Sequence, residues 1–599
     1  MSRPNSCREV AITVFFHVVT TVFLLQILAA VIFPEQMYVP PFRRRKMTPD
    51  MQSKPRQEDD ISNLYRYQSL LYGPGTVQAL ESQLQKLLKN HERPGDDYYG
   101  FNVTRSDEIS ATRHVIDERP YECKNKYFEY SFLPTLSVVT PFHNVALTPF
   151  LRHVHAIVSR TPPQLLLDVI LVDDNSTFSY LGEDLQEYFR ILNNRIRIIR
   201  NKERKGLILS RLRGAEEARG DVVVFLDAHM EVCEGWVEPL LEKINSQPAI
   251  VVQADITQID ENTLDLKTDD SAKYRGGFGW DMRYMRFPLP QYLRQFRDAD
   301  WKPFSTPVLQ GSCIAVRKDY FKAIGQFDPG LEIWGGEHFD LSFNVWMTGG
   351  RIETVPCSKV GHIYKNNNYS LGSGDKMYGI TKNILRVAEI WMDEYKHIVR
   401  AAVFGHLQNR FPSLSEAELK SYIPVFTEAE EKSLRQRQYL RKEHNSQPFA
   451  WFLKAVMPEQ KIPLREYLNS GEIINEKTRD SFFVFDDGHI GTTGTEAGVI
   501  VPDNTFSLDR YGRLKYEDRC VGYDERNLLV INPCPFDQKG ITTWKYDNNK
   551  LVIVQKSTRL CATQTTSRVL FHTEKELVQL LACDEENQKQ NWTFTFTYK

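Results

Sequence analysis

The chain is poor in cysteine and has no excess of basic residues. Nine cysteines in 599 residues are too few for a disulfide-stapled scaffold, although they suffice for a few bridges. Lysine and arginine number 75 against 77 aspartates and glutamates, which leaves a net charge of only −2. No overall basic field exists to hold a polyanion, so we expect no nucleic-acid partner.

Apolar residues are not scarce. Hydrophobic residues make up 41% and charged residues 25% of the chain, which allows most of it to bury cores. This composition excludes a mainly disordered or collagen-like protein. At about 150 residues per domain, a chain of this length is expected to hold two to four domains.

One long stretch near the amino terminus lacks charge altogether. Residues 10–33 contain no charged side chain, and a helix of that length crosses about 30 Å of hydrocarbon. We expect a signal-anchor over 10–33, preceded by a cytosolic tail over 1–9. A cleaved signal peptide is the alternative, but the run is long for one and no clean small-residue cleavage site ends it.

The signals of orientation disagree. Arg43 to Lys46 form a basic cluster after the span, which under the positive-inside rule would place the bulk of the chain in the cytosol. Glycosylation sequons, which have meaning only in the secretory lumen, also lie beyond the span. With the chemistry described below, they lead us to expect a single-pass type II protein with a luminal main part. The sequons begin at Asn102, Asn175, Asn368 and Asn591.

Three regions of different pattern follow the span. Residues 34–115 are polar and punctuated by Pro and Gly, which predicts a stem with a short helix near 77–89. Apolar runs then alternate with amphipathic segments, which predicts a parallel sheet with helices on both faces. After about residue 480, short strand-like runs predict a small all-β domain. In the middle region we expect strands at 136–142, 166–174, 195–200 and 221–227, and helices at 149–160 and 206–219.

Acidic residues stand where two of these strands end. Asp173 and Asp174 close one strand and Asp227 closes another, and ligands bind at the carboxyl ends of parallel strands. Helix capping or turn formation is the alternative for Asp173 and Asp174. In an extended backbone residues i and i+2 point the same way, so Asp227 and His229 are expected to hold one cation. A carboxylate with an imidazole suits Mn²⁺.

Several segments carry a resemblance to a known family. They are FLDAHMEVCEGWVEPLL at 225–241, the run at 327–364 that contains Trp-Gly-Gly-Glu and ends in VGHIY, VDDNS at 172–176, and RKGLILSRLRGA at 204–215. Together they resemble the polypeptide N-acetylgalactosaminyltransferases, Golgi enzymes that start mucin-type O-glycans. The resemblance covers about 134–400, and Gln590-Asn591-Trp592 resembles the Gln-x-Trp mark of ricin-type β-trefoil repeats.

The resemblance implies the domain plan and the activity. It implies a GT-A fold, which is α/β, Rossmann-like and mostly parallel, over 116–455, a linker over 456–479 and a ricin-type lectin domain over 480–599. It also implies Mn²⁺-dependent transfer of GalNAc from UDP-GalNAc to Ser or Thr hydroxyls of proteins, with retention of configuration, at the Golgi membrane. A divalent metal would neutralise the charge that grows on the diphosphate, and the diphosphate would accept the proton of the acceptor hydroxyl.

Residue roles follow from the same resemblance, position by position. It implies that Mn²⁺ is held by three ligands, Asp227, His229 and His362. The uridine and diphosphate side would be bound by Asp174, Arg204 and Lys365. Trp334 and Glu337 would face the sugar and the reacting centre as catalytic residues. For Glu337, capping the first turn of the following helix is the alternative.

Several positions depart from the family pattern around the donor site. Pro141 stands where the family has Thr, Gln310-Gly311-Ser312 replaces Ala-Gly-Gly, and His338 replaces Asn. Lys365 and Asn368 stand where the family has Arg and His, and Lys lacks the planar fork that binds phosphate bidentately. Two alternatives therefore stay open. One is a catalytically weak or inactive luminal protein that binds glycopeptides or regulates other enzymes, and the other is a transferase with a different donor, such as UDP-galactose or UDP-GlcNAc.

The resemblance also implies the disulfides and the state of the tail. The implied bridges are Cys123–Cys357, Cys520–Cys534 and Cys561–Cys583. Cys233 and Cys313 have no family partner and are expected to be buried thiols, with a bridge between them as the alternative. An Asp that accepts hydrogen bonds from sugar hydroxyls in the family is replaced by Gly522 and Thr563. We expect Trp592 to pack in the core of the β-domain.

Overall fold

The computed structural model describes most of the chain from Pro74 onward. The described residues are 74–89, 94–267 apart from 116 and 118, 273–364, 376–411, 414–460, 462, and 467–597 apart from 479, 486, 494–505, 510–511, 517–518, 534–541, 548, 556–557 and 568–574. The expected tail at 1–9 and signal-anchor at 10–33 lie outside them, as do Lys365, Asn368 and Cys534. Within the described ranges, no helix is both long enough and apolar enough to cross a membrane.

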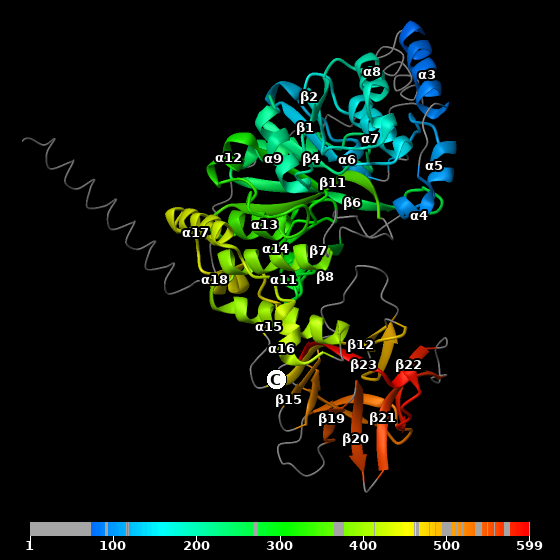
Figure 1. Ribbon diagram of the computed structural model, residues 1–599, viewed down its shortest axis with the longest axis vertical. Coiled ribbons are helices and arrows are strands. Elements are labelled where there is room, and N and C mark those ends of the chain that lie inside the picture. Colours follow the sequence, from blue (N-terminus) through cyan, green and yellow to red (C-terminus); the bar gives the residue numbers. More distant parts are fainter. Residues whose placement is uncertain are drawn as a thin grey trace, which may run out of the picture. The chain divides into compact units, whose positions relative to one another are not determined.

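A mixed sheet organises the region between residues 136 and 363 (Figure 1). Its first half is parallel in the order β3-β2-β1-β4 and consists of β1 (Leu136–Phe142), β2 (Leu166–Asp173), β3 (Ile196–Arg200) and β4 (Val222–Leu226). These are the strands that the apolar runs predicted. The second half continues through β10 (Cys313–Arg317), β6 (Ile250–Ile259), β11 (Arg351–Ile363) and β5 (Met230–Val232), with β9 (Phe304–Ser305) on β11. Strand β10 runs antiparallel to both neighbours, so the sheet is mixed rather than parallel throughout.

The central strands are buried on both faces. In β4, Val223 and Phe225 belong to one apolar core, whereas Val224 and Leu226 belong to another. Helix α9 (Leu207–Glu217) contributes to the first core and α7 (Leu147–Arg160) to the second. Because both faces need apolar side chains, the strands read as continuous apolar runs without alternation.

Further helices enlarge the two cores. Helices α13 (Glu337–Met347), α14 (Lys376–Trp391), α15 (Lys396–Arg410) and α18 (Phe449–Ala455) contribute to the first core, and α8 (Glu183–Leu192) and α10 (Glu238–Ser246) to the second. The other α-helices and strands between residues 136 and 455 are β7 (Tyr274–Phe278), β8 (Tyr284–Pro288), α11 (Gln291–Phe296), α12 (Lys318–Ala323), α16 (Glu416–Ser421) and α17 (Glu428–Glu443).

The segment expected to be a stem is more structured than its composition suggests. Besides the predicted helix, seen as α3 (Pro74–Lys89), it contains α4 (Asp96–Tyr99) and α5 (Val103–Glu108), and α6 (Tyr121–Lys124) follows. The side chains of Tyr99, Phe101 and Val103 are buried in a small core that also holds Ile363 of β11. These apolar residues explain why the chain from about residue 96 packs onto the sheet region and does not behave as a polar tether.

The carboxyl-terminal region is all β, as predicted. Its strands are β12 (Tyr467–Asn475), β13 (Ser481–Val484), β14 (Ile490–Thr493), β15 (Phe506–Asp509), β16 (Leu514–Tyr516), β17 (Arg519–Tyr523), β18 (Leu529–Pro533), β19 (Trp544–Asp547), β20 (Lys550–Gln555), β21 (Thr558–Ser567), β22 (Lys575–Ala582) and β23 (Trp592–Thr597). Strand β12 lies inside the range 456–479 that we expected to be a linker, yet it pairs with β15 and β23. Its Ile473 is buried in the same core as Trp592, so the β-region begins before residue 480.

Candidate functional site

Three side chains from two strand ends converge on one point. Asp227 and His229 lie in the connection between β4 and β5, and His362 lies near the end of β11. One ligand atom from each comes within 4.8 Å of the other two. Nε2 of His362 is 3.5 Å from Oδ2 of Asp227, and the two imidazole centroids are 4.7 Å apart. The three residues implied as metal ligands are therefore brought together.

The reason for this convergence differs from the expected one. We expected Asp227 and His229 to point the same way along an extended strand, but β4 ends at Leu226 and residues 227–229 form a turn. The turn is held where the Asp227 N–H donates to the Ser312 carbonyl at 3.3 Å. His362 is then added because its backbone lies opposite Met230 in the β5–β11 pair.

The donor set fits a divalent cation such as Mn²⁺. Burial raises the pKa of the Asp227 carboxyl, but its hydrogen bond with His362 and the charge of Arg211 outweigh burial and hold that pKa below its ordinary value. Asp227 is therefore ionised at neutral pH. The Nδ1 atom of His362 is buried and has no hydrogen-bond partner in the described part of the chain. One carboxylate with two imidazoles is a mixed oxygen and nitrogen set that Mn²⁺ accepts.

Arg211, which the sequence did not single out, connects the cluster to its surroundings. It lies on α9 with 1% of its surface exposed. Its Nη2 donates to Oδ1 of Asp227 at 2.9 Å and to the Gly311 carbonyl at 2.7 Å, and its Nη1 is 3.7 Å from Oε1 of Glu337. An arginine on a predicted helix is compatible with an exposed face, so nothing in the sequence indicated its burial; once buried, an arginine is almost always paired.

Glu337 opens helix α13 and is held as an anion. Burial raises the pKa of its carboxyl, but hydrogen bonding to His338 and the charges of His338 and Arg211 outweigh burial and bring that pKa to about 2. Its Oε2 accepts the Gly335 N–H at 3.1 Å. The carboxylate therefore reaches back to the loop before the helix.

The loop at residues 332–336, here called the Trp334 loop, is held from two sides. Asn383 on α14 donates from Nδ2 to the carbonyls of Glu332 and Gly335 at 2.7 and 2.9 Å and accepts the Glu332 N–H at 2.9 Å. On the other side, the Leu207 N–H donates to the Ile333 carbonyl at 2.7 Å. Asn383 was missed in the sequence, since nothing nearby in the chain marks its role. Trp334 is 37% exposed, so this hydrogen-bonded loop presents an aromatic surface.

Asp174 organises the loop that carries Arg204. It is 4% exposed, and its carboxylate accepts from the Asn201 side chain and from the N–H groups of Lys205 and Gly206 at 2.7–2.8 Å. Nearby His143 has an Nδ1 atom 2.8 Å from the Asp174 carbonyl oxygen. Burial and the charge of Arg204 lower the pKa of the His143 imidazole. Asp174 thus has the turn-forming role that was the alternative, and it also holds the loop that carries the cation of Arg204.

The departing residues Gln310 to Ser312 lie between the metal cluster and α13. The Gln310 N–H donates to Oε1 of Gln253 at 2.8 Å, and its side-chain amide donates to the hydroxyl of Tyr364. A Cβ atom on Gly311 would stand 3.4 Å from Cβ of His338. The retained Gly311, which lies between the departing residues Gln310 and Ser312, is therefore close to His338, another departure from the family pattern.

Comparison with known proteins identifies the family of this chain. The family model for glycosyl transferase family 2 matches residues 137–325. Polypeptide N-acetylgalactosaminyltransferase 5 of Caenorhabditis elegans is 31% identical over 503 residues, which are 82% of this chain and 75% of that protein. The chain belongs to the polypeptide N-acetylgalactosaminyltransferase family.

Two further members of the family match a shorter part of the chain or match it at a lower identity. Polypeptide N-acetylgalactosaminyltransferase 4 of Mus musculus is 39% identical over 366 residues, or 61% of this chain and 59% of that protein. The chain thus spans less than two thirds of that relative's length. A crystal structure of GalNAc-T7 with UDP, GalNAc and Mn²⁺ superimposes with a TM-score of 0.56 at 28% identity, covering 87% of this chain and 90% of that one.

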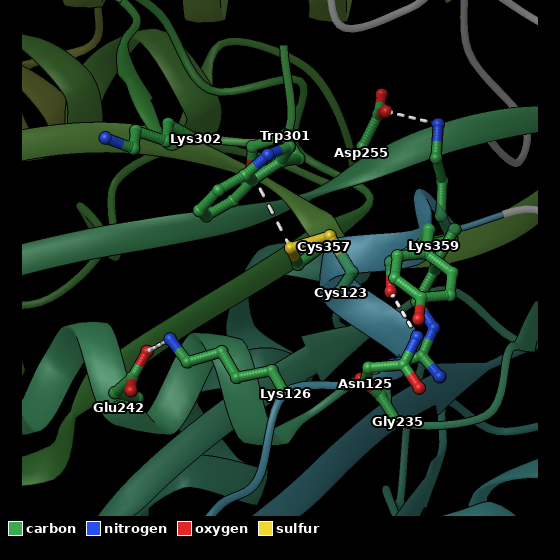
Figure 2. The surroundings of a disulfide bond; sticks show 12 residues. Cys123, Asn125, Lys126, Gly235, Glu242, Asp255, Trp301, Lys302, Cys357 and Lys359 are labelled. Atoms are coloured by element: carbon green, nitrogen blue, oxygen red, sulfur yellow. Dashed lines mark hydrogen bonds and ion pairs between the residues drawn. A yellow bond between two sulfur atoms is a disulfide. The ribbon is translucent and has the colours of Figure 1, made fainter. Parts of the chain in front are cut away.

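Two of the disulfides implied by the family resemblance are present. Cys123 of α6 is bridged to Cys357 of β11, with Trp301 beside the bridge (Figure 2). This bridge ties the start of the sheet region to the strand that carries His362. Cys561 is bridged to Cys583 in the β-region. Cys233 and Cys313 are free and buried, as expected, whereas the Cys520–Cys534 bridge stays a prediction because Cys534 lies outside the described residues.

Proposed function

We propose that this chain transfers GalNAc from UDP-GalNAc to Ser or Thr hydroxyls of proteins and so initiates mucin-type O-glycosylation, with retention of configuration and dependence on Mn²⁺. The observation that carries the proposal is the cluster of Asp227, His229 and His362, whose ligand atoms lie within 4.8 Å of one another. Family membership supplies the substrate class. The GalNAc-T7 structure, with UDP, GalNAc and Mn²⁺, supports the donor and the metal.

In this proposal Asp227, His229 and His362 hold Mn²⁺, which neutralises charge on the diphosphate when bound. Arg204, on the loop that Asp174 holds, adds a positive charge for the diphosphate, with Lys365 as a second cation. Asp174 acts through the loop it holds and not by direct contact alone, because its carboxylate already accepts from that loop. These residues bind and orient the donor.

Glu337 and Trp334 act beside the sugar. A carboxyl group with a pKa of about 2 is a weak base at neutral pH, so Glu337 is not suited to take the acceptor proton. Its ion pair with Arg211 and its bond to Gly335 suit it to fix the Trp334 loop against the metal cluster. The exposed indole of Trp334 then offers a face against which sugar or peptide packs. The proton of the acceptor hydroxyl passes to the diphosphate.

A direct assay tests this function. The purified chain is incubated with Mn²⁺, a Ser/Thr-rich peptide and, in separate reactions, UDP-GalNAc, UDP-galactose and UDP-GlcNAc. We expect GalNAc transfer that is lost in Asp227→Asn and His229→Ala together with Mn²⁺-dependent UDP binding. If only UDP-galactose or UDP-GlcNAc supports transfer, that nucleotide sugar and not UDP-GalNAc is the donor. Intact UDP binding without any transfer would favour the non-catalytic, glycopeptide-binding alternative.

We also propose that the protein is a single-pass type II protein of the Golgi membrane, anchored by residues 10–33, with its main part in the lumen. Two sequon asparagines are compatible with glycosylation. Asn175 is exposed, and Asn102 uses its Oδ1 to accept the Arg105 N–H at 2.7 Å, which leaves its amide nitrogen for the glycan. Loss of mass on endoglycosidase treatment of the membrane-inserted protein tests this orientation, and no loss at all would favour the reverse one. Asn368 and Asn591 are the other two acceptors to be mapped.

For the all-β region we propose a ricin-type β-trefoil. Two indoles support a repeated unit, because Trp544 donates to the Val521 carbonyl at 2.9 Å and Trp592 donates to the Ala562 carbonyl at 2.8 Å. Each accepting residue directly follows a cysteine of the expected repeats. Thr563, which stands in place of a sugar-binding Asp, accepts from Gln590 at 3.0 Å and is buried. That position therefore serves the core, and we expect no sugar site there.

A further inference from the structure

Strand β5 lies next to both histidines of the proposed metal site. His229 directly precedes β5, and Met230 in β5 lies opposite His362 in the antiparallel pair with β11. A shift of β5 relative to β11 therefore changes the spacing of the two imidazoles. Whatever fixes β5 also fixes the geometry of the metal ligands.

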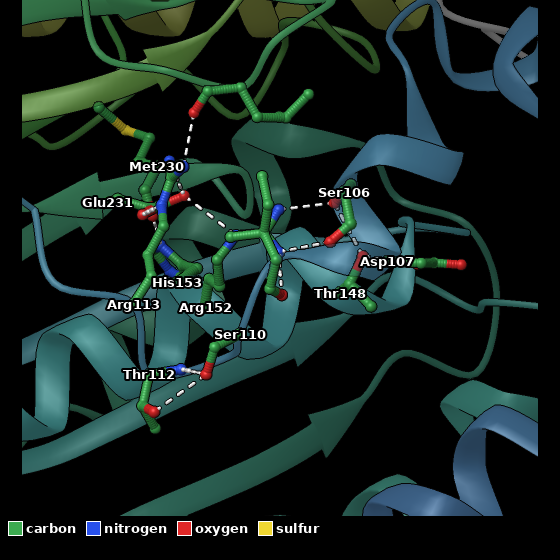
Figure 3. Close-up of polar contacts among 12 residues, drawn as sticks. Ser106, Asp107, Ser110, Thr112, Arg113, Thr148, Arg152, His153, Met230 and Glu231 are labelled. Carbon is green, nitrogen blue, oxygen red and sulfur yellow. Dashed lines mark hydrogen bonds and ion pairs between the residues drawn. The ribbon is translucent and has the colours of Figure 1, made fainter.

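The middle residue of β5, Glu231, pairs with two arginines (Figure 3). Arg113 donates from Nε to Oε2 and from Nη2 to Oε1, each at 2.8 Å. Arg152 on α7 donates from Nε to Oε1 at 3.2 Å. Glu231 is 2% and Arg152 is 1% exposed, so water does not compete for these bonds. A bidentate arginine–carboxylate pair of this kind fixes geometry as well as adding energy.

The same arginines are tied to the segment that precedes the sheet region. Arg152 donates from Nη1 to the Ser106 carbonyl at 2.9 Å and from Nη2 to the Ser106 hydroxyl at 2.6 Å. Arg113 donates from Nη1 to the Leu264 carbonyl at 2.6 Å. Ser106 and Arg113 both lie in the range that composition assigned to the stem. Through Glu231, this segment holds β5, the strand that follows His229 and pairs with the strand of His362.

The residues on either side of Glu231 are held as well. Nδ1 of His153, on α7, is 2.8 Å from the Met230 carbonyl oxygen. Arg160, at the end of α7, donates to the Val232 carbonyl at 2.6 Å and to the Arg113 carbonyl at 2.7 Å. Each residue of β5 therefore has a polar partner on α7 or on the preceding segment, so β5 has little freedom to shift against β11.

We propose that Arg113, Glu231 and Arg152 form a positioning clamp for the metal centre, by which residues 106–113 set where His229 stands relative to His362. The three act through the backbone of β5, so they are positioning residues, and the inference rests on the proposed metal function. Loss of Arg113 leaves a buried Glu231–Arg152 pair of zero net charge, whereas loss of the Glu231 charge leaves two buried cations. The structure tolerates the first change better, which makes Arg113 the residue to alter.

The test measures metal affinity and not activity alone. Mn²⁺ is titrated into the purified full-length chain, and the free ion is followed by its electron paramagnetic resonance signal. Arg113→Met is expected to raise the Mn²⁺ Kd about tenfold, at the lower end of the effect of altering outer partners of metal sites. Arg113→Lys, which keeps the charge but loses the fork, is expected to raise it less. In activity assays, the Mn²⁺ concentration for half-maximal rate should rise more than kcat at saturating Mn²⁺ falls.

The matched control is Arg105→Met, on α5 in the same segment. Arg105 pairs at the surface with Glu108 at 2.9 Å, so its loss should leave the Mn²⁺ Kd unchanged. A lower unfolding temperature with an unchanged Mn²⁺ Kd in folded Arg113→Met would overturn the clamp, because the network would then serve stability alone. If that variant does not fold, an unchanged Kd in Arg113→Lys overturns it equally. Failure of the proposed function looks different, since wild type and Asp227→Asn would then bind Mn²⁺ alike.

Discussion

A single methyl group at Gly206 is expected to separate the loop at Gly206 from the loop that carries Trp334, both of which belong to the proposed donor site. Gly206 has φ 86° and ψ 175°, a combination that is essentially restricted to glycine. A Cβ atom there would lie 2.2 Å from Cα and 2.6 Å from the carbonyl oxygen of Ile333. Both contacts are with backbone, so no side-chain rotation relieves them.

The magnitude of Gly206→Ala follows from these two effects. Holding a non-glycine residue in this region costs about 1–3 kcal/mol, and an overpacked contact costs about another 1–3 kcal/mol. We therefore expect the free energy of unfolding to fall by about 2–6 kcal/mol in total. The least costly relief moves the Trp334 loop away and breaks the bond from the Leu207 N–H to the Ile333 carbonyl, now 2.7 Å long. Since the Gly206 N–H also holds Asp174, UDP binding should weaken about tenfold or more.

Urea denaturation and calorimetric titration with UDP in the presence of Mn²⁺ measure both effects. Gly379→Ala is the matched control, because Gly379 lies inside α14 and a Cβ there meets nothing within 4 Å. Alanine in a helix interior should raise stability by up to about 1 kcal/mol and leave UDP binding unchanged. A Gly206→Ala protein as stable as wild type, with the same UDP affinity, would refute the argument that this close approach assembles the site.

Other predictions concern pH, the Trp334 loop and the donor contacts. Burial lowers the pKa of His153 and His155 to about 4, so below their unfolded pKa of 6.5 the unfolded chain binds more protons than the folded one. The free energy of unfolding should therefore fall as the pH drops from 6.5 to 4, by about 3 kcal/mol per histidine. Urea denaturation at several pH values measures this loss. Asn383→Ala removes hydrogen bonds of roughly 1 kcal/mol each from the Trp334 loop and should weaken UDP-GalNAc binding more than UDP binding, whereas an equal loss for both ligands would contradict this role. A triple variant that restores the family residues should bind UDP more tightly, and looser binding would mean that the departures suit a different pocket shape. Its substitutions are Pro141→Thr, Lys365→Arg and Asn368→His.

Local patterns in the sequence determined much of this protein. The continuous apolar runs predicted β1 to β4 because a strand buried on both faces needs apolar side chains at every position. The amphipathic runs between them predicted α7 and α9. The cluster of Asp227, His229 and His362 was also predicted from the chain itself, through an acidic strand end and the family resemblance. Each of these signals lies within a short stretch of sequence.

Contacts between distant segments could not be predicted in this way. Arg211 meets the Gly311 carbonyl 100 residues away, and Asn383 holds a loop about 50 residues before it. Their residue types are compatible with a solvent-exposed helix face, so only the packed fold reveals that they are buried and paired. The turn at 227–229 belongs here too, because a hydrogen bond to Ser312 in a distant connection sets it.

The segment before the sheet region shows most clearly how tertiary contacts differ from what the sequence pattern predicts. Its Pro, Gly and polar residues indicate a tether, and by composition that interpretation is sound. Yet three apolar side chains near residue 100 are buried, and Arg113 reaches Glu231 in β5, 118 residues along the chain. Composition records how many groups can be buried or charged. The tertiary structure alone decides which partner each one meets, because pairing energies depend on distance in space and not on separation along the chain.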